Sequence, residues 1–558
     1  MREQSVHLAM QPCGITANRL DAVQPRRRGE KLACNDLALW SIGMPEMTST
    51  HRILHFVALL PAIGCYAPHS PVVTGDASTD DVDGSSTTAI TVSASTTGDT
   101  TSSMTATAAM DETGSTDDSG STTGSPVCGD AVVNGDEVCD DGINDGSYGG
   151  CVADCSDLGP HCGDSIQQGD EACDDGDQSN GNGCNVDCIV SGTVLWTQVF
   201  DGPGHDADAG RALALDEEDA IYVVGDVDLY STAWIRRLDT HGTEDWTQTF
   251  AGPANGASNP SAAAWGGSPE LHVVGTHDAS SLANDDDAWL RRYTEASTLD
   301  GSFTWDNSAN TADHAAGIAV NDNGQQFVLG DSNRFDLDQS WNVWLRKLDV
   351  EGDEMWTQTY DGGAADEAGG LAIDGDGNVI AVGQTIVSGD GRNVWVRKYS
   401  TEGATLWTRT YAGAGGCSDY GNDVAVDADD NVVVVGQSCG DVFVQKFAAD
   451  GSVEWNDTFD GPDGLADLAA GVAADSQGAV IVAGAQWVDY HQDAWVRKYS
   501  SDGQELWTYA NSPDDDSVWS DAAAVEVDST DAIVVVGSIQ QDVPDGAPSD
   551  VWVQKFAP

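Results

Sequence analysis

The chain has 558 residues, of which 92 are acidic and 23 basic, so its formal net charge at pH 7 is −69. Phosphate backbones and anionic lipid headgroups would repel such a chain, which argues against nucleic acids and charged membrane surfaces as partners. The acidity has two interpretations. It can serve solubility in salty surroundings, or it can bind cations such as calcium, for which carboxylates are suitable hard ligands.

The N-terminal region has the features of an export signal. Residues 1–46 show no hydrophobic period, and we expect a non-native or disordered extension that precedes the true start. From Met47, a short basic stretch leads to the apolar run 53–63, which predicts a signal peptide over 47–64. Residues 62–65, Ala-Ile-Gly-Cys, resemble a bacterial lipobox. The resemblance implies lipidation of Cys65 and an outer-membrane or cell-surface lipoprotein. Plain secretion and an apolar patch without signal function are the alternatives.

A low-complexity segment follows over residues 65–127. Ser, Thr, Gly and Asp dominate it, and aromatic residues are nearly absent. Such a segment cannot bury enough apolar surface to offset the entropy of ordering, so we expect a disordered tether.

Residues 128–190 contain two copies of one Cys-rich unit. Each copy carries Cys-Gly-Asp followed by Gly-Asp-Glu-x-Cys-Asp-Asp-Gly, at 135–142 and 169–176. A unit this small cannot build a core, so crosslinks must hold it, and two disulfides per copy are expected in an exported chain. The cysteines are Cys128, Cys139, Cys151 and Cys155, matched by Cys162, Cys173, Cys184 and Cys188.

Other interpretations of this unit remain open at the level of sequence. A zinc site is the alternative to disulfides, although paired Cys-x-x-Cys motifs are absent. The repeated Asp residues either hold calcium or form solvated turns; they are Asp140, Asp141, Asp174 and Asp175. The unit resembles the Cys-rich repeat of myxobacterial surface proteins, which implies a spacer or display module.

Residues 191–558 form a repeat array. A segment such as Trp395-Val-Arg-Lys-Tyr recurs seven times at intervals of about 50 residues, and so does a Trp-anchored strand that follows it. With two preceding β-branched runs, each unit predicts four short strands. The array resembles bacterial seven-bladed β-propeller repeat proteins, so we predict an all-β fold with seven blades.

The phase of the repeat predicts how the ring closes. The array begins with a fourth strand at 194–200 and ends with a third strand at 551–556. Pairing these two segments would complete the last blade and remove exposed strand edges.

Two regular features have structural interpretations. In five units an Arg or Gln lies ten residues before the Trp of the next strand: Arg236, Arg346, Arg397, Gln445 and Arg497. We predict a cation–π contact between each Arg and that Trp. Cys417 and Cys439 are symmetric about a predicted turn, so we expect a disulfide between them.

An Asp recurs eight residues before the end of the first strand, where we expect it to ring one mouth of the central channel. Calcium capture is the functional interpretation, and hydrogen bonding within its own loop is the structural one. These candidate metal ligands are Asp208, Asp313, Asp366, Asp419 and Asp467.

The longer connections of the repeat fall on one face, where binding sites are common. Their aromatic residues are candidate contacts for a ligand: Tyr230, Phe335, Trp341, Tyr420, Trp487, Tyr490 and Trp519. No nucleophile elbow or phosphate-binding loop is present in the sequence. We therefore hypothesise a monomeric, non-catalytic surface protein that binds a glycan or a protein, with calcium as an optional aid. The alternative is a polysaccharide lyase or hydrolase that uses carboxylates on this face.

Overall fold

The computed structural model describes residues 128–133, 137–169, 171–202, 206–227, 232–253, 256–266, 270–278, 286–306, 312–333, 341–362, 364–462, 464–488, 491–511, 519–540 and 548–558. The predictions for residues 1–127, including the signal peptide, Cys65 and the tether, lie outside these residues. Every element named in the described part is a β-strand, and no described helix is long and apolar enough to cross a membrane.

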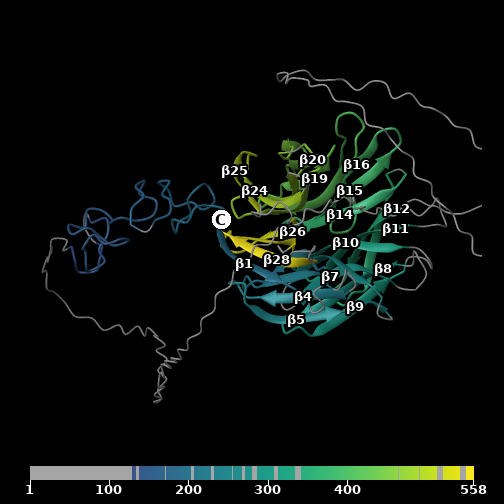
Figure 1. Ribbon diagram of the computed structural model, residues 1–558, viewed down its shortest axis with the longest axis horizontal. Helices are drawn as coiled ribbons and strands as arrows, with labels where there is room; N and C mark the ends of the chain where they lie inside the picture. The colour runs from purple at the N-terminus through teal and green to yellow at the C-terminus, as the bar shows by residue number, and fades with distance from the viewer. Residues whose placement is uncertain are drawn as a thin grey trace, which may run out of the picture. The chain divides into compact units, whose positions relative to one another are not determined.

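The predicted seven-bladed propeller is confirmed: 28 strands form seven four-stranded antiparallel sheets (Figure 1). Blade 1 contains β2 (Ala209–Leu215), β3 (Ile221–Val227), β4 (Thr232–Leu238) and β5 (Glu244–Phe250). Blade 2 contains β6 (Ser258–Trp265), β7 (Glu270–Asp278), β8 (Asp286–Thr294) and β9 (Leu299–Trp305). Blade 3 contains β10 (Asp313–Val320), β11 (Gln326–Asn333), β12 (Trp341–Leu348) and β13 (Glu354–Tyr360).

The remaining blades repeat this order. Blade 4 contains β14 (Asp366–Ile373), β15 (Val379–Val387), β16 (Gly391–Tyr399) and β17 (Thr405–Tyr411). Blade 5 contains β18 (Asp419–Val426), β19 (Val432–Ser438), β20 (Asp441–Phe447) and β21 (Val453–Phe459). Blade 6 contains β22 (Leu468–Ala474), β23 (Val480–Val488), β24 (His491–Tyr499) and β25 (Glu505–Asn511). Blade 7 contains β26 (Ser520–Val527), β27 (Ile533–Gln540), β28 (Ser549–Phe556) and, from the start of the array, β1 (Val194–Phe200).

The ring closes as the repeat phase predicted. Strand β1 pairs antiparallel with β28, with Trp196 opposite Lys555 and Phe200 opposite Val551 (Figure 1). The side chains reinforce this pairing, because Gln554 Nε2 donates to Thr197 Oγ1 at 2.9 Å. The last blade thereby gains its outer strand from the opposite end of the array.

The core lies between the blades. In β19, Val432 and Val434 pack in a cluster with residues of blade 4, whereas Val433 and Val435 pack with residues of blade 6. All four are fully buried. Alternate side chains of a strand face opposite sides, so a continuous β-branched run serves both neighbouring blades. Each buried Val contributes roughly 1.5–3 kcal/mol of hydrophobic stabilisation.

The turn between the first two strands carries a buried ion pair. Asp374 Oδ1 accepts hydrogen bonds from the amides of Asp376 and Asn378, and its Oδ2 lies 2.6 Å from Lys398 Nζ. The same pairing occurs in four other blades: Asp216–Arg237, Asp427–Lys446, Asp475–Lys498 and Asp528–Lys555. The basic residues of the third strands therefore have a structural role.

The prediction that the third-strand Arg contacts the Trp ten residues later is wrong, because the Arg contacts a different aromatic ring. Arg236 pairs with Thr247, and Arg237 pairs with Trp246, so the side chains of Arg236 and Trp246 face opposite sides of the sheet. Arg236 instead lies 4.1 Å from the ring centroid of Phe200 in the preceding blade. Equivalent contacts join Arg291 to Phe250, Arg397 to Tyr360 and Arg497 to Phe459. The cation–π contacts thus link neighbouring blades.

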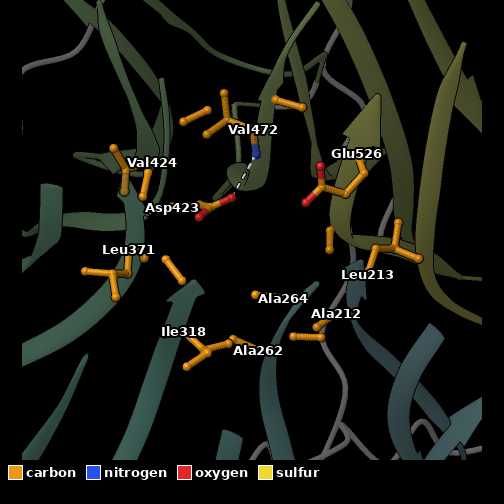
Figure 2. A pocket seen from close by; sticks show the side chains of 18 of the residues that line it. Ala212, Leu213, Ala262, Ala264, Ile318, Leu371, Asp423, Val424, Val472 and Glu526 are labelled. Carbon is orange, nitrogen blue, oxygen red and sulfur yellow. Dashed lines mark hydrogen bonds between the residues drawn. The ribbon is translucent and has the colours of Figure 1, made fainter. Parts of the chain in front are cut away.

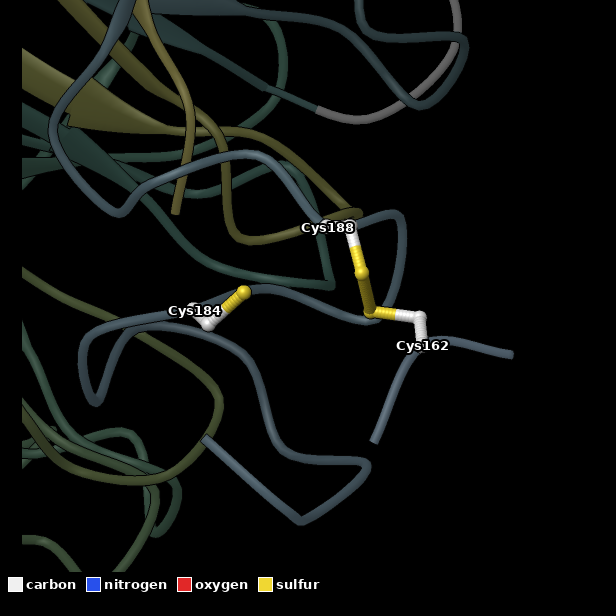
Figure 3. A group of neighbouring side chains, drawn as sticks. All are labelled: Cys162, Cys184 and Cys188. Carbon is white, nitrogen blue, oxygen red and sulfur yellow. A yellow bond between two sulfur atoms is a disulfide. The ribbon is translucent and has the colours of Figure 1, made fainter. Parts of the chain in front are cut away.

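The Cys-rich module is held by disulfides in both copies. The first copy joins Cys128 to Cys155 and Cys139 to Cys151, and the second joins Cys162 to Cys188 and Cys173 to Cys184. Figure 3 shows Cys184 near the Cys162–Cys188 bond. All eight sulfurs are used in disulfides, which argues against the zinc alternative and indicates an oxidising, exported setting.

The Asp residues of this module belong to its turns. Asp140 Oδ2 accepts hydrogen bonds from the amides of Gly129 and Asp130, and Asp174 Oδ2 does the same with Gly163 and Asp164. Desolvation would raise the pKa of Asp140, but the amide hydrogen bonds outweigh it and lower that pKa to about 2. Asp141 and Asp175 likewise accept from the amides of Cys151 and Cys184. This arrangement fits the turn interpretation.

Candidate functional site

A polar pocket of about 430 Å³ lies where the inner strands of blades 2 to 5 meet the longer connections. We call the end of the propeller that carries these connections the loop face, and this cavity the mouth pocket. Its polar lining consists of Ser261, Thr276, His314, Asp331, Gln384 and Asn422. A neighbouring pocket of about 290 Å³ shares Ser261, Thr276 and His314, so the two form one extended polar surface.

In blade 3, an aromatic and a charged side chain meet at this pocket. His314 Nδ1 lies 3.2 Å from Asp331 Oδ1, its cross-strand partner, and its ring stacks on Trp341 with centroids 4.9 Å apart. Burial opposes protonation of His314, but the hydrogen bond and charge of Asp331 prevail and raise its pKa. Asp331 Oδ2 also accepts a hydrogen bond from the amide of Ala368 in blade 4.

In blade 4, a second charged group lies beside the pocket and contacts its wall through Gln384, although Glu367 and Arg392 are not among the lining residues. Glu367 Oε1 lies 2.6 Å from Arg392 Nη1, and Glu367 Oε2 accepts a hydrogen bond from Gln384 Nε2 at 2.9 Å. The Arg392 guanidinium is 5.6 Å from the ring centroid of Tyr420 in blade 5. The three blades therefore present donors, acceptors and two aromatic faces next to one another.

One repeat position supplies most of this chemistry. It is the second residue of the inner strand, or the residue equivalent to it in blades where the strand begins one residue later. In every blade this residue pairs with the same position of the second strand. Its occupants in blades 1 to 7 are Ala209, Asn259, His314, Glu367, Tyr420, Leu468 and Asp521. The fold repeats seven times but this position does not, and its aromatic and charged occupants are concentrated in blades 3 to 5.

The candidate aromatic residues have different locations. Trp341 stacks on His314, which lines the mouth pocket, and Tyr420 precedes Gly421, which also lines it; neither aromatic residue is itself among the lining residues. Trp487 and Trp519 are half-buried in blades 6 and 7 and do not line it. Tyr230, Phe335 and Tyr490 lie outside the described residues. The sequence interpretation missed Asp331, Glu367, Gln384 and Arg392, which a comparison of equivalent strand positions would have brought out.

The recurring Asp residues do not form the expected ring at the channel mouth. Their side chains are buried, and they are absent from the residues that line the channel. Asp419 accepts hydrogen bonds from the Gly413 amide at 2.6 Å and the Ser438 hydroxyl at 2.7 Å. Asp208, Asp366 and Asp467 accept from the amides of Gly202, Gly362 and Gly461. The loop that precedes Asp313 lies outside the described residues. For the other four Asp residues, the hydrogen bonds fit the structural interpretation, in which each Asp holds its own loop.

A disulfide closes one blade of the loop face. Cys417 and Cys439 are joined, and their Cα atoms are 5.1 Å apart. Cys439 has a φ of 59° and is followed by Gly440, so the connection between β19 and β20 is a very short one.

No family model and no curated protein matches the chain. Several solved structures are similar at low identity. A protein of unknown function from Dyadobacter fermentans is 9% identical with a TM-score of 0.38, and the match covers 66% of this chain and 100% of that one. A protein of unknown function from Bacteroides caccae is 9% identical with a TM-score of 0.35, covering 55% and 94%. Drosophila Plexin A in complex with Semaphorin 1b is 9% identical with a TM-score of 0.38, covering 66% and 87%. These similarities carry no information about function.

Proposed function

We propose that this chain is an exported binding protein whose mouth pocket recognises a surface glycan. The observation that supports it most is the cluster of His314, Trp341 and Asp331 beside Glu367 and Arg392. A sugar ring has an apolar face that packs on aromatic rings and an edge of hydroxyl groups that need both donors and acceptors. The cluster offers both kinds of contact, with the adjoining pocket to take a further sugar unit.

The carboxylates of Asp331 and Glu367 already have partners within the protein, which favours binding of a glycan over its cleavage. A glycosidase needs one carboxyl group that can donate a proton to the leaving oxygen. Asp331 already contacts His314 and the Ala368 amide, and Glu367 already contacts Arg392 and Gln384. Carboxylates engaged in this way hold a ligand or a neighbouring side chain better than they donate a proton to a substrate.

The N-terminal part of the chain would hold the propeller at the cell surface. Lipidation of Cys65 would anchor the chain, and residues 65–127 would act as a tether. The disulfide-bonded module at 128–190 would then serve as a protease-resistant spacer. The propeller would be presented as a monomer, with its binding face supplied by one chain.

A glycan array probed with the full-length mature chain tests this proposal. We expect binding to at least one bacterial surface polysaccharide. We expect His314→Ala and Glu367→Gln each to weaken that binding about tenfold or more, as central contacts do. Leu468→Ala changes the equivalent strand position in blade 6, outside the mouth pocket, and is the matched control. Equal binding by all three variants, or release of shorter sugars from the bound polymer, would contradict the proposal.

A further inference from the structure

The central channel is a cavity of about 620 Å³ lined by the seven inner strands (Figure 2). It adjoins the mouth pocket, with which it shares Ser261, Ala316, Gly369 and Asn422. Two positions of each inner strand supply small residues to its wall. The first position is occupied by Ala212, Ala262, Gly317, Gly370 or Ala524, and the second by Ala214, Ala264, Ala319, Ala372, Ala425 or Ala473. Such a wall leaves space along the axis but offers no charged side chain of its own.

Two carboxylates break this pattern. Asp423 in β18 takes the place of Gly or Ala at the first position, and Glu526 in β26 takes the place of Ala at the second. Figure 2 shows both side chains directed into the cavity from different sides. They belong to blades 5 and 7, and only blade 6 separates them. Neither side chain is required by the blade repeat, because the other blades fold without it.

The protein leaves these charges largely uncompensated. Asp423 Oδ2 accepts a hydrogen bond from the Val472 amide at 3.0 Å. Glu526 has no hydrogen-bond or ion-pair partner among the residues that the structure describes. The other ionisable residue that lines the channel is Arg211, whose Nε is 2.8 Å from Asp226 Oδ2. Two like charges that face the same channel repel each other, and a counter-charge between them would relieve that repulsion.

The backbone around the channel adds further oxygen ligands. Each inner strand is an edge strand of its sheet, because only its outer neighbour pairs with it. Half of its peptide groups therefore have no ladder partner and point toward the axis or the adjacent blade. Carbonyl oxygens, carboxylates and water are together the ligand set that calcium prefers.

We propose that the central channel binds a divalent metal cation, best matched by calcium, between Asp423 and Glu526. The cation neutralises the two carboxylates and joins blade 5 to blade 7 through the axis. Neither carboxylate is among the residues that line the mouth pocket, and the site does not depend on the identity of any glycan.

Calcium titration of the full-length chain, treated first with a chelator and kept in about 0.15 M KCl to screen surface charge, tests the proposal. The test variant is Asp423→Asn with Glu526→Gln. The matched control is Asp429→Asn with Glu454→Gln, which removes the same charge from an exposed pocket at the tight turns. We expect the wild type and the control to bind one more calcium ion per chain than the test variant, by equilibrium dialysis. We also expect calcium to raise the Tm of the wild type and of the control, and to raise the Tm of the test variant much less.

A second measurement does not depend on how the variants fold. In crystals of the wild-type chain soaked in calcium, we expect an anomalous scattering peak within coordination distance of both carboxylates. Equal calcium stoichiometry in the test and control variants, or a channel without such a peak, would overturn the proposal.

Discussion

The Asp that stands at the start of the inner strand in five blades shows how a single side chain fixes a connection between blades. Asp419 is fully buried and holds both the Gly413 amide and the Ser438 hydroxyl. Removing its carboxylate would leave these groups unpaired in the interior. Each buried unpaired polar group costs about 1–3 kcal/mol.

We therefore predict that Asp419→Ala lowers the free energy of unfolding by about 2–5 kcal/mol, measured by urea denaturation. Because the carboxylate acts within its own loop, the loss should be the same with calcium and with a chelator. A loss that occurs only in calcium would restore the metal-binding interpretation of this residue.

The channel carboxylates make a different prediction, which concerns the metal-free protein. Burial raises the pKa of Asp423 to about 7, and burial together with the charge of Asp423 raises the pKa of Glu526 to about 7. Unfolded Asp and Glu have pKa values near 4, so both groups favour the folded state when protonated. Their contribution is fully present below about pH 4 and is lost as the pH rises through about 7. Because the two groups interact, they should titrate as a pair.

In chelator, Tm of the wild type should accordingly fall between about pH 4 and pH 7. Asp423→Asn with Glu526→Gln should flatten this slope, since neither replacement titrates. Parallel Tm profiles for the two proteins across this range would count against a raised pKa at these positions.

At the scale of the strand, a buried ion pair in five of the seven blades ties the third strand to the turn between the first two strands. Lys446 Nζ lies 2.8 Å from Asp427 Oδ2, and both side chains are almost fully buried. Removing one member of such a pair leaves the other charge buried without a partner, which costs about 3–5 kcal/mol. Replacing both members is far less harmful.

We predict that Lys446→Met destabilises the chain by about 3–5 kcal/mol, whereas Lys446→Met combined with Asp427→Asn recovers part of that loss. Urea denaturation of both single variants, Lys446→Met and Asp427→Asn, of the double variant and of the wild type measures this coupling. If the double variant is less stable than Lys446→Met by the full cost of Asp427→Asn alone, the pair is not coupled as described.

The strands and the ring closure could be predicted from the sequence because they depend on a period. Seven copies of a four-stranded unit, out of phase at the two ends, indicate β1 pairing with β28, as observed. The Arg–Trp contact was predicted wrongly because the register shifts between Arg237 and Leu238, so that counting along the hairpin places Arg236 on the wrong face. A shift of one residue is invisible in residue spacing but reverses the side of the sheet.

The mouth pocket could be predicted only in part. The loop face followed from the lengths of the connections, and two of its aromatic residues, Trp341 and Tyr420, were among the candidates. His314, Asp331 and Glu367 come from different strands, and their proximity depends on how three blades pack. The channel pair was overlooked for a related reason, since Asp423 and Glu526 are about 100 residues apart and come near each other only when blades 5 to 7 pack around the axis.

At the scale of the whole molecule, the propeller separates a repeating scaffold from a face that does not repeat. The interblade clusters recur around the ring and hold it rigid. The mouth pocket varies from blade to blade, and closure by β1 and β28 keeps the inner strands in place around it. A rigid scaffold with a variable face is suited to recognition, because little conformational entropy is lost on binding.

Hydrogen–deuterium exchange of the full-length chain, with and without its bound polysaccharide, tests the assignment of the mouth pocket most directly. We predict slower exchange in the loop-face ends of β10, β14 and β18, which carry His314, Glu367 and Tyr420. Exchange in the tight turns that begin at Asp374 and Asp427 should be unchanged. Protection of those turns or of the outer strands, with the ends of β10, β14 and β18 unaffected, would contradict recognition at the mouth pocket.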